Sequence, residues 1–306
     1  MLNAIGNTPL VRLNKVVPTG AASVWVKLEY FSPTGSYKDR MALSMVERAE
    51  ARGDLRPGMT VVEYTGGSTG ISLAFVCAVK GYRCRIVSND AVAKEKLRSM
   101  EAFGAELEIL KSEGGKLTAD LVPRMMARAR EIAAEGPSYA TDQMRNPDMV
   151  AGYESLGEEL LRQMKEPVHT FCAAVGTSGM LMGTARALRR SSPATRIVAF
   201  EPATSAVLSG GAPGAHGVEG VAPGFVPPQF DRSVVSETRG IDEEEGRRMA
   251  RQLARQEGLF AGTSTGLNVA GAIQIAREIG AGHSVVTVAV DSGLKYLAGD
   301  LFAAQT

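Results

Sequence analysis

One lysine in this sequence stands where it can act as a nucleophile. Residues 32–40 read Ser-Pro-Thr-Gly-Ser-Tyr-Lys-Asp-Arg, a turn-forming run that delivers Lys38 to the start of an amphipathic helical pattern. On composition alone, most lysines are solvated surface residues. A lysine beside a phosphate-binding turn has another use, because its amine forms a Schiff base with an aldehyde cofactor while the turn holds the phosphate. Lys38 is a candidate for such a link if phosphate-binding turns accompany it.

Three turns rich in glycine and hydroxyl side chains each stand between a strand-like run and a helical pattern. They cover residues 65–70 (TGGSTG), 176–180 (GTSGM) and 262–266 (GTSTG). Backbone N–H groups at a helix N-terminus bind anions, and glycine allows close approach. One such turn is also an ordinary helix entry, whereas three in one chain favour phosphate or carboxylate binding. None reads GxGxxG and no GxxxxGK[ST] occurs, which disfavours a dinucleotide or nucleoside triphosphate site at these turns.

The elements that must position these turns alternate along the chain. Short runs rich in β-branched residues predict strands at 61–64, 83–88, 107–110, 170–175, 196–200 and 284–290. Apolar residues spaced three to four apart predict helices at 41–52, 71–80, 118–135, 181–190, 242–257 and 267–278. Strands that alternate with helices are typical of βαβ units and mostly parallel sheets. We therefore expect an α/β fold, with ligands beyond the carboxyl ends of the strands.

The chain length and two irregular segments indicate two lobes. At 306 residues the chain exceeds the size at which single cores stop growing. The segment 142–150 (DQMRNPDMV) is the predicted junction, because a strand-like SYAT ends there and Pro147 can begin the next helix. The Gly/Pro-rich stretch 202–232 is the only long irregular segment, and we expect it to be a functional loop or lid.

Charge and composition exclude several classes of function. The net charge is +1 with acids and bases interspersed, so no field is present to gather nucleic acid or an anionic membrane. No apolar run approaches a membrane span and the N-terminus lacks a signal-peptide layout, so we expect a cytoplasmic protein that acts on a small molecule. Cys77, Cys84 and Cys172 lie in apolar stretches without a CxxC, and the three histidines are scattered. We expect buried thiols and no metal site.

Eight motifs, in order along nearly the whole chain, resemble the β-family (fold type II) of pyridoxal phosphate enzymes, and within it cysteine synthase and cystathionine β-synthase. The motifs are IGNTPLVRL, SPTGSYKDR, TGGSTG, DQMRNP, GTSGM, GVEGVAPGFVP, GTSTG and DSGLKYL. The resemblance implies a tryptophan synthase β-like fold, with two lobes each built on a mostly parallel twisted sheet that has helices on both faces. It also implies pyridoxal 5'-phosphate as the cofactor.

Carried over by position, the resemblance assigns a role to each site residue. Lys38 would hold the cofactor and later move the substrate's α-proton, and Ser292 would hydrogen-bond the ring nitrogen. The phosphate would lie on Gly176, Thr177, Ser178, Gly179 and Met180, mostly on their backbone N–H groups. The substrate carboxylate would face Thr65, Gly66, Ser68, Thr69 and Gln143, with Ser68 also facing the cofactor. A neutral hydroxyl at the ring nitrogen makes the ring a weaker electron sink, which favours prompt loss of a β-substituent.

Three positions depart from the family pattern. Ser68 stands where the family's TSGNTG loop has asparagine, and Gly66 stands where it has serine. A serine hydroxyl is shorter than an asparagine amide, so the choice of substrate is affected. Met180 replaces a threonine of the phosphate cradle, which removes one hydroxyl and leaves the backbone donors.

The implied function is β-replacement on an activated serine, such as O-acetylserine, with sulfide to give cysteine. The alternatives are a cystathionine β-synthase-type condensation of serine or O-acetylserine with homocysteine or another nucleophile, a β-eliminating lyase or deaminase, and a family member that binds without turnover. By resemblance we expect a homodimer. We also expect a smaller mobile N-terminal lobe (1–12 and 35–146) and a larger C-terminal lobe (13–34 and 147–306).

Overall fold

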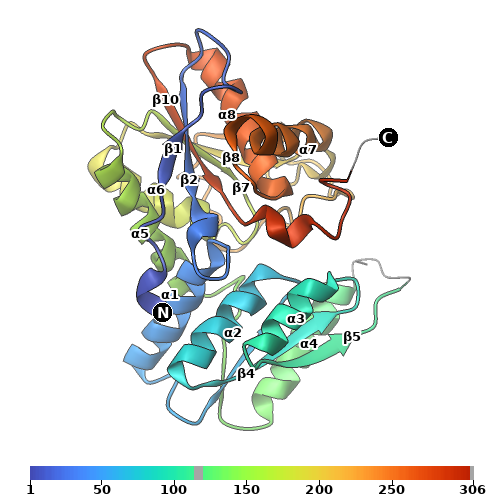
Figure 1. Cartoon of the computed structure of the whole chain (residues 1–306). Coiled ribbons are helices and arrows are strands. Elements are labelled where there is room, and N and C mark those ends of the chain that lie inside the picture. Colours follow the sequence, from blue (N-terminus) through green and yellow to red (C-terminus); the bar gives the residue numbers. More distant parts are fainter. Residues whose placement is uncertain (114–119, 304–306) are drawn as a thin grey trace. The chain divides into compact units, whose positions relative to one another are not determined.

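The computed structural model describes residues 1–113 and 120–303, and the chain divides into two compact units. Unit 1 comprises Met1–Ile5 and Lys38–Gly152, and unit 2 comprises Gly6–Tyr37 and Tyr153–Thr306. Each unit has its own sheet, of four strands in unit 1 and six in unit 2 (Figure 1). The predicted α/β class with two mostly parallel sheets is confirmed. The mobility of the smaller lobe stays a prediction.

Unit 1 is a parallel sheet in the order β5-β4-β3-β6. Its strands are β3 (Thr60–Tyr64), β4 (Arg83–Asn89), β5 (Glu106–Leu110) and β6 (Ser138–Ala140). Its helices are η1 (Leu2–Ala4), α1 (Lys38–Arg52), α2 (Ser68–Lys80), α3 (Lys94–Ala102) and α4 (Leu121–Ala134), and α5 (Pro147–Gln163) begins here. The predicted helix over 118–135 corresponds to α4, and positions 118 and 119 lie outside the described residues.

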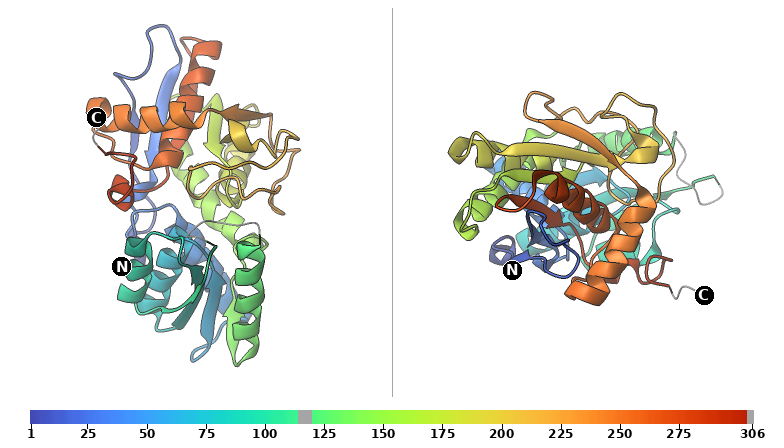
Figure 2. Two further views of the ribbon diagram at one scale, coloured as in Figure 1. Left: turned by 90° about the vertical axis from the view of Figure 1, so that its right-hand side faces the viewer. Right: turned by 90° about the horizontal axis from the view of Figure 1, so that it is seen from above.

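The two faces of this sheet are covered by different helices. Val62, Tyr64 and Val87 pack against α4 in one apolar cluster. The intervening residues Val61 and Ile86 are also fully buried, as the two-residue period of a strand requires when both faces are covered. Figure 2 shows α4 on one side of the sheet and α2 and α3 on the other. Parallel strands covered on both faces therefore read as short apolar runs, which is why they could be predicted.

Unit 2 is a mixed sheet in the order β1-β2-β10-β7-β8-β9, parallel except for the β1–β2 pair. The strands are β1 (Leu10–Arg12), β2 (Ser23–Leu28), β7 (Thr170–Ala174), β8 (Arg196–Pro202), β9 (Glu237–Ile241) and β10 (Ser284–Ala289). The helices are η2 (Glu29–Phe31), the end of α5, α6 (Gly179–Ser191), η3 (Ala203–Ser205), α7 (Glu243–Gln252), the π-helical turn η4 (Leu253–Glu257), α8 (Thr263–Ile279) and η5 (Gly293–Tyr296).

The strand β1 belongs to unit 2, whereas we expected it in the smaller lobe. We assigned residues 1–12 to the smaller lobe, but Leu10, Val11 and Arg12 pair with Lys27, Val26 and Trp25 of β2. The segment Gly6–Tyr37, which contains β1 and β2, therefore belongs to unit 2. A three-residue strand gives almost no periodic signal, so its partner had to come from the structure.

The core of unit 2 lies between its sheet and α8. Val24, Val26, Val198 and Phe200 point to one face, where they pack with Ile273 and other α8 residues. Between β8 and β9, only η3 interrupts a long irregular segment, which agrees with the irregular stretch expected at 202–232. Cys77, Cys84 and Cys172 are buried and free, so the expectation of buried thiols is confirmed.

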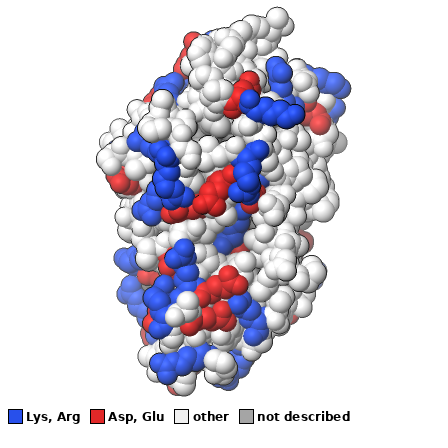
Figure 3. Space-filling model, turned by 90° about the vertical axis from the view of Figure 1, so that its left-hand side faces the viewer, with Lys and Arg blue, Asp and Glu red and all other residues white. Residues whose placement is uncertain are grey.

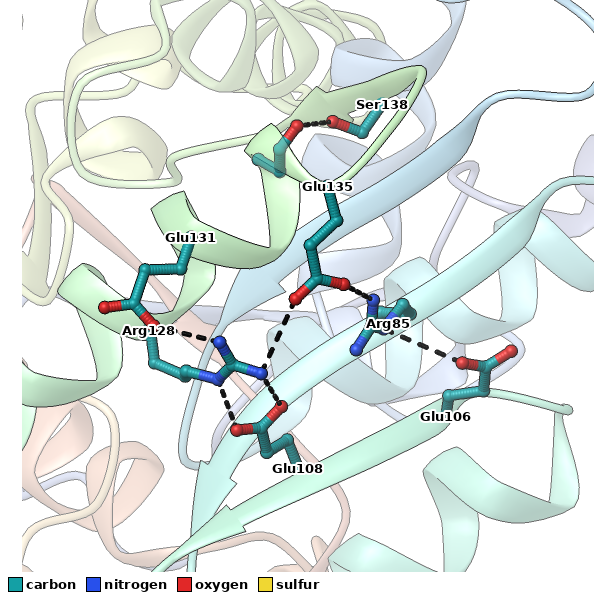
Figure 4. A network of polar contacts seen from close by, with 8 residues as sticks. Arg85, Glu106, Glu108, Arg128, Glu131, Glu135 and Ser138 are labelled. Atoms are coloured by element: carbon teal, nitrogen blue, oxygen red, sulfur yellow. Dashed lines mark hydrogen bonds and ion pairs between the residues drawn. The ribbon is translucent and has the colours of Figure 1, made fainter.

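Many charged side chains lie at the surface and pair with one another. Figure 3 shows acidic and basic side chains interspersed on one face. In unit 1, Arg128 binds Glu108 and Glu131, and Arg85 binds Glu135 at 2.7 Å (Figure 4). Exposed pairs of this kind stabilise a fold by at most about 1 kcal/mol each. None of the described helices is long and apolar enough to span a membrane.

Candidate active site

The segment before Lys38 is tied to the segment that contains Ser292. Gly35 adopts a left-handed φ of 68°, and its carbonyl accepts from Ser292 N at 3.0 Å. Tyr37 N donates to the Val290 carbonyl at 3.1 Å. Within unit 2, the turn that leads into α1 therefore lies directly against the strand end that carries Ser292. Lys38 follows as the first residue of α1 and is 7% exposed.

Ser292 is oriented as a hydrogen-bond donor. Its Oγ accepts from Leu294 N at 3.2 Å at the start of η5, which leaves the hydroxyl proton for an acceptor such as an unprotonated ring nitrogen. The preceding Asp291 is buried and accepts from the Tyr296 hydroxyl at 3.0 and 3.2 Å. Burial, with the Asp291 charge adding to it, raises the pKa of Tyr296 well above its ordinary value. Tyr296 thus remains protonated and holds the turn in place.

The phosphate-binding turn follows β7 and leads into α6. Gly179 is the first residue of α6, and Ser178 precedes it with a left-handed φ of 69°. The Ser178 Oγ is buried and has no hydrogen-bond partner among the described residues. The first N–H groups of a helix have no intrahelical acceptor. A buried hydroxyl and N–H groups without intrahelical acceptors at the same helix start are suited to a phosphate, so residues 176–180 fit the expected cofactor.

Gly176 is needed at this turn because another backbone segment passes beside it. A Cβ built on Gly176 would lie 2.2 Å from the Gly220 carbonyl oxygen. Gly220 belongs to the irregular segment, which is tied back to the turn because Ala222 N donates to the Val175 carbonyl at 2.8 Å. The irregular segment therefore forms one wall of the phosphate turn.

We expect Gly176→Ala to weaken cofactor binding by up to about 100-fold, because the turn must shift to relieve the backbone contact. Titration of apo-protein with pyridoxal phosphate, followed by absorbance, gives the dissociation constant. Gly136→Ala is the matched control, since a Cβ there meets nothing within 4 Å. Unchanged cofactor affinity in Gly176→Ala would show that the turn does not hold the phosphate.

The substrate half of the predicted site lies in unit 1. Thr65 follows β3, and its Oγ1 accepts from Gly67 N at 3.2 Å. Thr69, in the first turn of α2, donates through Oγ1 to Gln143 Oε1 at 2.7 Å. Gln143 Nε2 donates to the Tyr64 carbonyl at 3.3 Å. The structure thus brings Thr65, Thr69 and Gln143 together, although 74 residues separate the last two.

Gly66 and Ser68 lie in the same loop. A Cβ on Gly66 would come 3.4 Å from Val92 Cγ2, so the serine that the family has there would meet Val92. Ser68 is the first residue of α2. Lys38, Thr65, Gly66, Ser68, Thr69 and Gln143 belong to unit 1, and residues 176–180 and Ser292 belong to unit 2.

One residue of this site was not predicted from the sequence. Glu63 of β3 is 1% exposed, and its Oε2 accepts from the Thr141 hydroxyl at 2.7 Å and from Gln143 N at 3.0 Å. Its Oε1 accepts from Tyr64 N at 2.9 Å. Glu63 therefore fixes the backbone of Gln143 beside the loop. The available signal was a carboxylate inside the apolar run VVEY, just before the TGGSTG turn.

The pKa of Glu63 is raised to about 7, mainly by burial and in small part by the nearby Asp142 charge. The three hydrogen bonds act in the opposite direction. A pKa raised from 4.5 favours the protonated form in the folded state. The resulting stabilisation is present below pH 4.5 and is lost as pH rises through 7, by about 3 kcal/mol.

Glu63→Gln removes this titration, so the variant should not lose stability as pH rises through 7. Its free energy of unfolding relative to that of wild type should therefore increase by about 3 kcal/mol between acidic and mildly alkaline pH. Urea unfolding at both pH values measures the difference. Glu135→Gln, on the exposed surface of the same unit, should show no such trend. If the difference in free energy of unfolding between wild type and Glu63→Gln stays constant with pH, the raised pKa of Glu63 is wrong.

Comparison with known proteins assigns the family. A family model described as pyridoxal-phosphate dependent enzyme matches residues 1–291. The chain is 39% identical to cysteine synthase of Staphylococcus aureus (strain Mu50 / ATCC 700699) over 301 residues, which cover 98% of this chain and 95% of that protein. A crystal structure of O-ureido-L-serine synthase matches 98% of this chain and 94% of its own with a TM-score of 0.93 at 37% identity.

Cysteine synthase from Entamoeba histolytica matches 100% of this chain and 90% of its own, with a TM-score of 0.93 at 33% identity. The relative and the two solved structures match 98% or more of this chain, so these matches include both units. The expected family resemblance and fold are confirmed. The chain therefore belongs to the pyridoxal-phosphate dependent enzymes, and its cofactor is pyridoxal phosphate.

Proposed function

We propose that the protein forms cysteine from an activated serine, O-acetylserine, and sulfide by β-replacement. The observation that carries the proposal is the Ser292 hydroxyl, which is held by the Leu294 N–H so that it can donate to the ring nitrogen. A neutral donor at that position favours prompt loss of a β-substituent. The cysteine synthase relative at 39% identity supports the same reaction.

The cofactor, when bound, supplies an aldehyde that links to an amine and an electron-withdrawing ring that makes the substrate's α-proton acidic. The Lys38 Nζ is the amine that holds it and then takes the α-proton. A proton can be accepted only by a neutral amine, so Lys38 must reach that state before the step. Its place at the buried start of α1, directly after the turn tied to Ser292, supports this role.

The remaining residues bind and orient. The N–H groups of residues 176–180 hold the phosphate, and Ser178 Oγ adds a hydroxyl there. Thr65, Gly66, Ser68, Thr69 and Gln143 bind the substrate carboxylate, with Glu63 behind Gln143. The Thr69–Gln143 hydrogen bond of 2.7 Å fixes two of these side chains relative to each other, which reduces the ordering needed when the carboxylate binds.

We also propose a cytoplasmic homodimer in which unit 1 closes over the substrate. The family resemblance supports these features. The oligomeric state is measurable by analytical ultracentrifugation.

A second candidate keeps the chemistry and changes the nucleophile. The substrate loop carries Gly66 and Ser68 in place of serine and asparagine, and O-ureido-L-serine synthase is among the similar structures. A nucleophile other than sulfide, such as homocysteine, would then take the β-position. A lyase that releases the product of elimination to water is the third reading.

The test is a product assay with the purified, cofactor-loaded enzyme. O-acetylserine with sulfide should give cysteine at a rate that exceeds the rates with homocysteine and the rate of pyruvate release without a nucleophile. Preference for homocysteine would move the assignment to the second candidate. Pyruvate as the main product in the presence of sulfide would move it to the lyase.

A further inference from the structure

A groove on unit 2 lies apart from all the residues assigned above. It has a volume of about 360 Å³ and lies between the loop before β2, the run from α7 into η4, and the end of α8. Its apolar part consists of Val16, Met249 and Ile273. Ile273 is 4% exposed, and Val16 and Met249 pack against the same core cluster. The floor of the groove is thus part of the rigid core.

One wall of the groove is held by a single carboxylate. Glu257 Oε1 accepts from the backbone N of Asn14 at 3.0 Å, of Lys15 at 2.5 Å and of Val16 at 3.0 Å. Glu257 ends the π-helical turn η4. Short π-helical turns are rare and occur often at functional sites. The loop that carries Lys15 is therefore fixed beside the groove.

The charge of the groove is unusual for this chain. Lys15, Arg248 and Arg277 line it, and none of them forms an ion pair within the part of the chain that the structure describes. By contrast, Arg247 forms ion pairs with Glu244 and Asp300. Arg239 forms ion pairs with Glu237 and Glu278.

A single carboxylate and two amides complete the lining. Glu245 accepts from Gln274 Nε2 at 3.0 Å, and Gln252 and Gln256 also face the groove. Among the residues that line the groove, three cations and one carboxylate leave two positive charges over an apolar floor, and the Glu257 carboxylate is occupied by the three backbone N–H groups of the wall. A ligand that matches this lining has two negative charges, an apolar body and polar edges that hydrogen-bond to amides.

We propose that this groove binds a nucleoside monophosphate. The phosphate dianion meets Lys15, Arg248 and Arg277, since guanidinium groups bind phosphate in bidentate fashion. The flat base lies on Val16, Met249 and Ile273, and its edge meets Gln252 and Gln256. The volume is at the lower end of the range for small-molecule sites, about 300 to 1,000 Å³. The proposal does not depend on the reaction catalysed elsewhere in the chain.

The test is calorimetric titration of the cofactor-loaded enzyme with AMP, inorganic phosphate and adenosine. AMP should bind more tightly than either part alone, and its affinity should fall with added salt. Arg248→Ala with Arg277→Ala should weaken AMP binding by about tenfold for each guanidinium removed. Lys15→Gln is an independent variant with the same expected direction.

The matched control is Arg255→Ala, an exposed arginine of the same η4 turn that does not line the groove. It should leave AMP binding unchanged. Unaltered thermal unfolding and cofactor absorbance in each variant show that folding is intact. The proposal is overturned if AMP does not bind at millimolar concentration, if the arginine variants bind it as wild type does, or if a glutamate-rich peptide binds there and AMP does not.

Discussion

Replacement of Lys38 by alanine is expected to lower the rate of cysteine formation by at least about 10³-fold, because one amine serves as both covalent link and proton acceptor. The change also removes the link to the cofactor, so the absorption band of the bound cofactor should shift to that of the free aldehyde. Stopped assays of cysteine and a visible spectrum measure the two effects on one sample. Lys38 is 7% exposed, so its loss should be accompanied by a check of folding.

Two controls make the Lys38 result specific. Lys38→Arg keeps a positive charge at the start of α1 but cannot form the link, so it should be as inactive as the alanine variant. Lys94→Ala, at the exposed start of α3 in the same unit, should keep wild-type activity. Near-normal activity in Lys38→Ala would contradict its role.

Lys27→Met is expected to lower the free energy of unfolding by about 3 to 5 kcal/mol, because it removes one member of a buried ion pair. Lys27 Nζ lies 2.6 Å from Glu159 Oε2, with side-chain exposures of 0% and 5%. Lys27 also donates to the Thr8 carbonyl at 2.6 Å and to Gln163 Oε1 at 2.9 Å. For a protein of this size we expect the melting temperature to fall by roughly 10 °C, which calorimetry measures.

We expect the loss of stability in Lys27→Met to come mainly from the desolvation of the Glu159 carboxylate, which Lys27 no longer offsets. Lys27→Met combined with Glu159→Leu should therefore recover most of the stability, since apolar replacements of whole buried pairs are often neutral. Arg190→Met is the surface control, because Arg190 is 54% exposed in its pairs with Glu154 and Glu158. It should cost at most about 1 kcal/mol. Equal losses in Lys27→Met and Arg190→Met would refute the buried-pair explanation.

The sequence predicts most of the parallel strands, including the edge strand β5, but it misses the buried strand β2, the edge strands β1 and β9, and the helix α3. Each of β3, β4 and β10 contains adjacent buried β-branched residues, because helices cover both faces of each sheet, and these strands were placed to within a residue or two. β1 is too short to show a period, and β9 (Glu237–Ile241) contains glycine and charged residues. The helix α3 has only two buried residues, Lys96 and Met100, so its apolar pattern is weak. These elements had to come from the structure.

The motifs predict which residues belong to the site, and the structure shows which residues they contact. The family resemblance puts Thr69 and Gln143 at the same carboxylate, but the hydrogen bond between them could not be predicted, because it depends on β6 pairing with β3. Glu63 was missed for the same reason, since its partners Thr141 and Gln143 lie beyond that strand. The conformation of Ser178 also had to come from the structure. It takes a left-handed φ of 69°, which is uncommon for residues other than glycine.

The measurement that tests the central claim most directly is the location of the cofactor on the chain. Reduction of the loaded enzyme with borohydride fixes the cofactor to the amine that holds it, and peptide mass mapping identifies that residue. We predict a single label on the peptide that contains Lys38. A label on another lysine, or full activity in an enzyme that carries no label, would contradict the account.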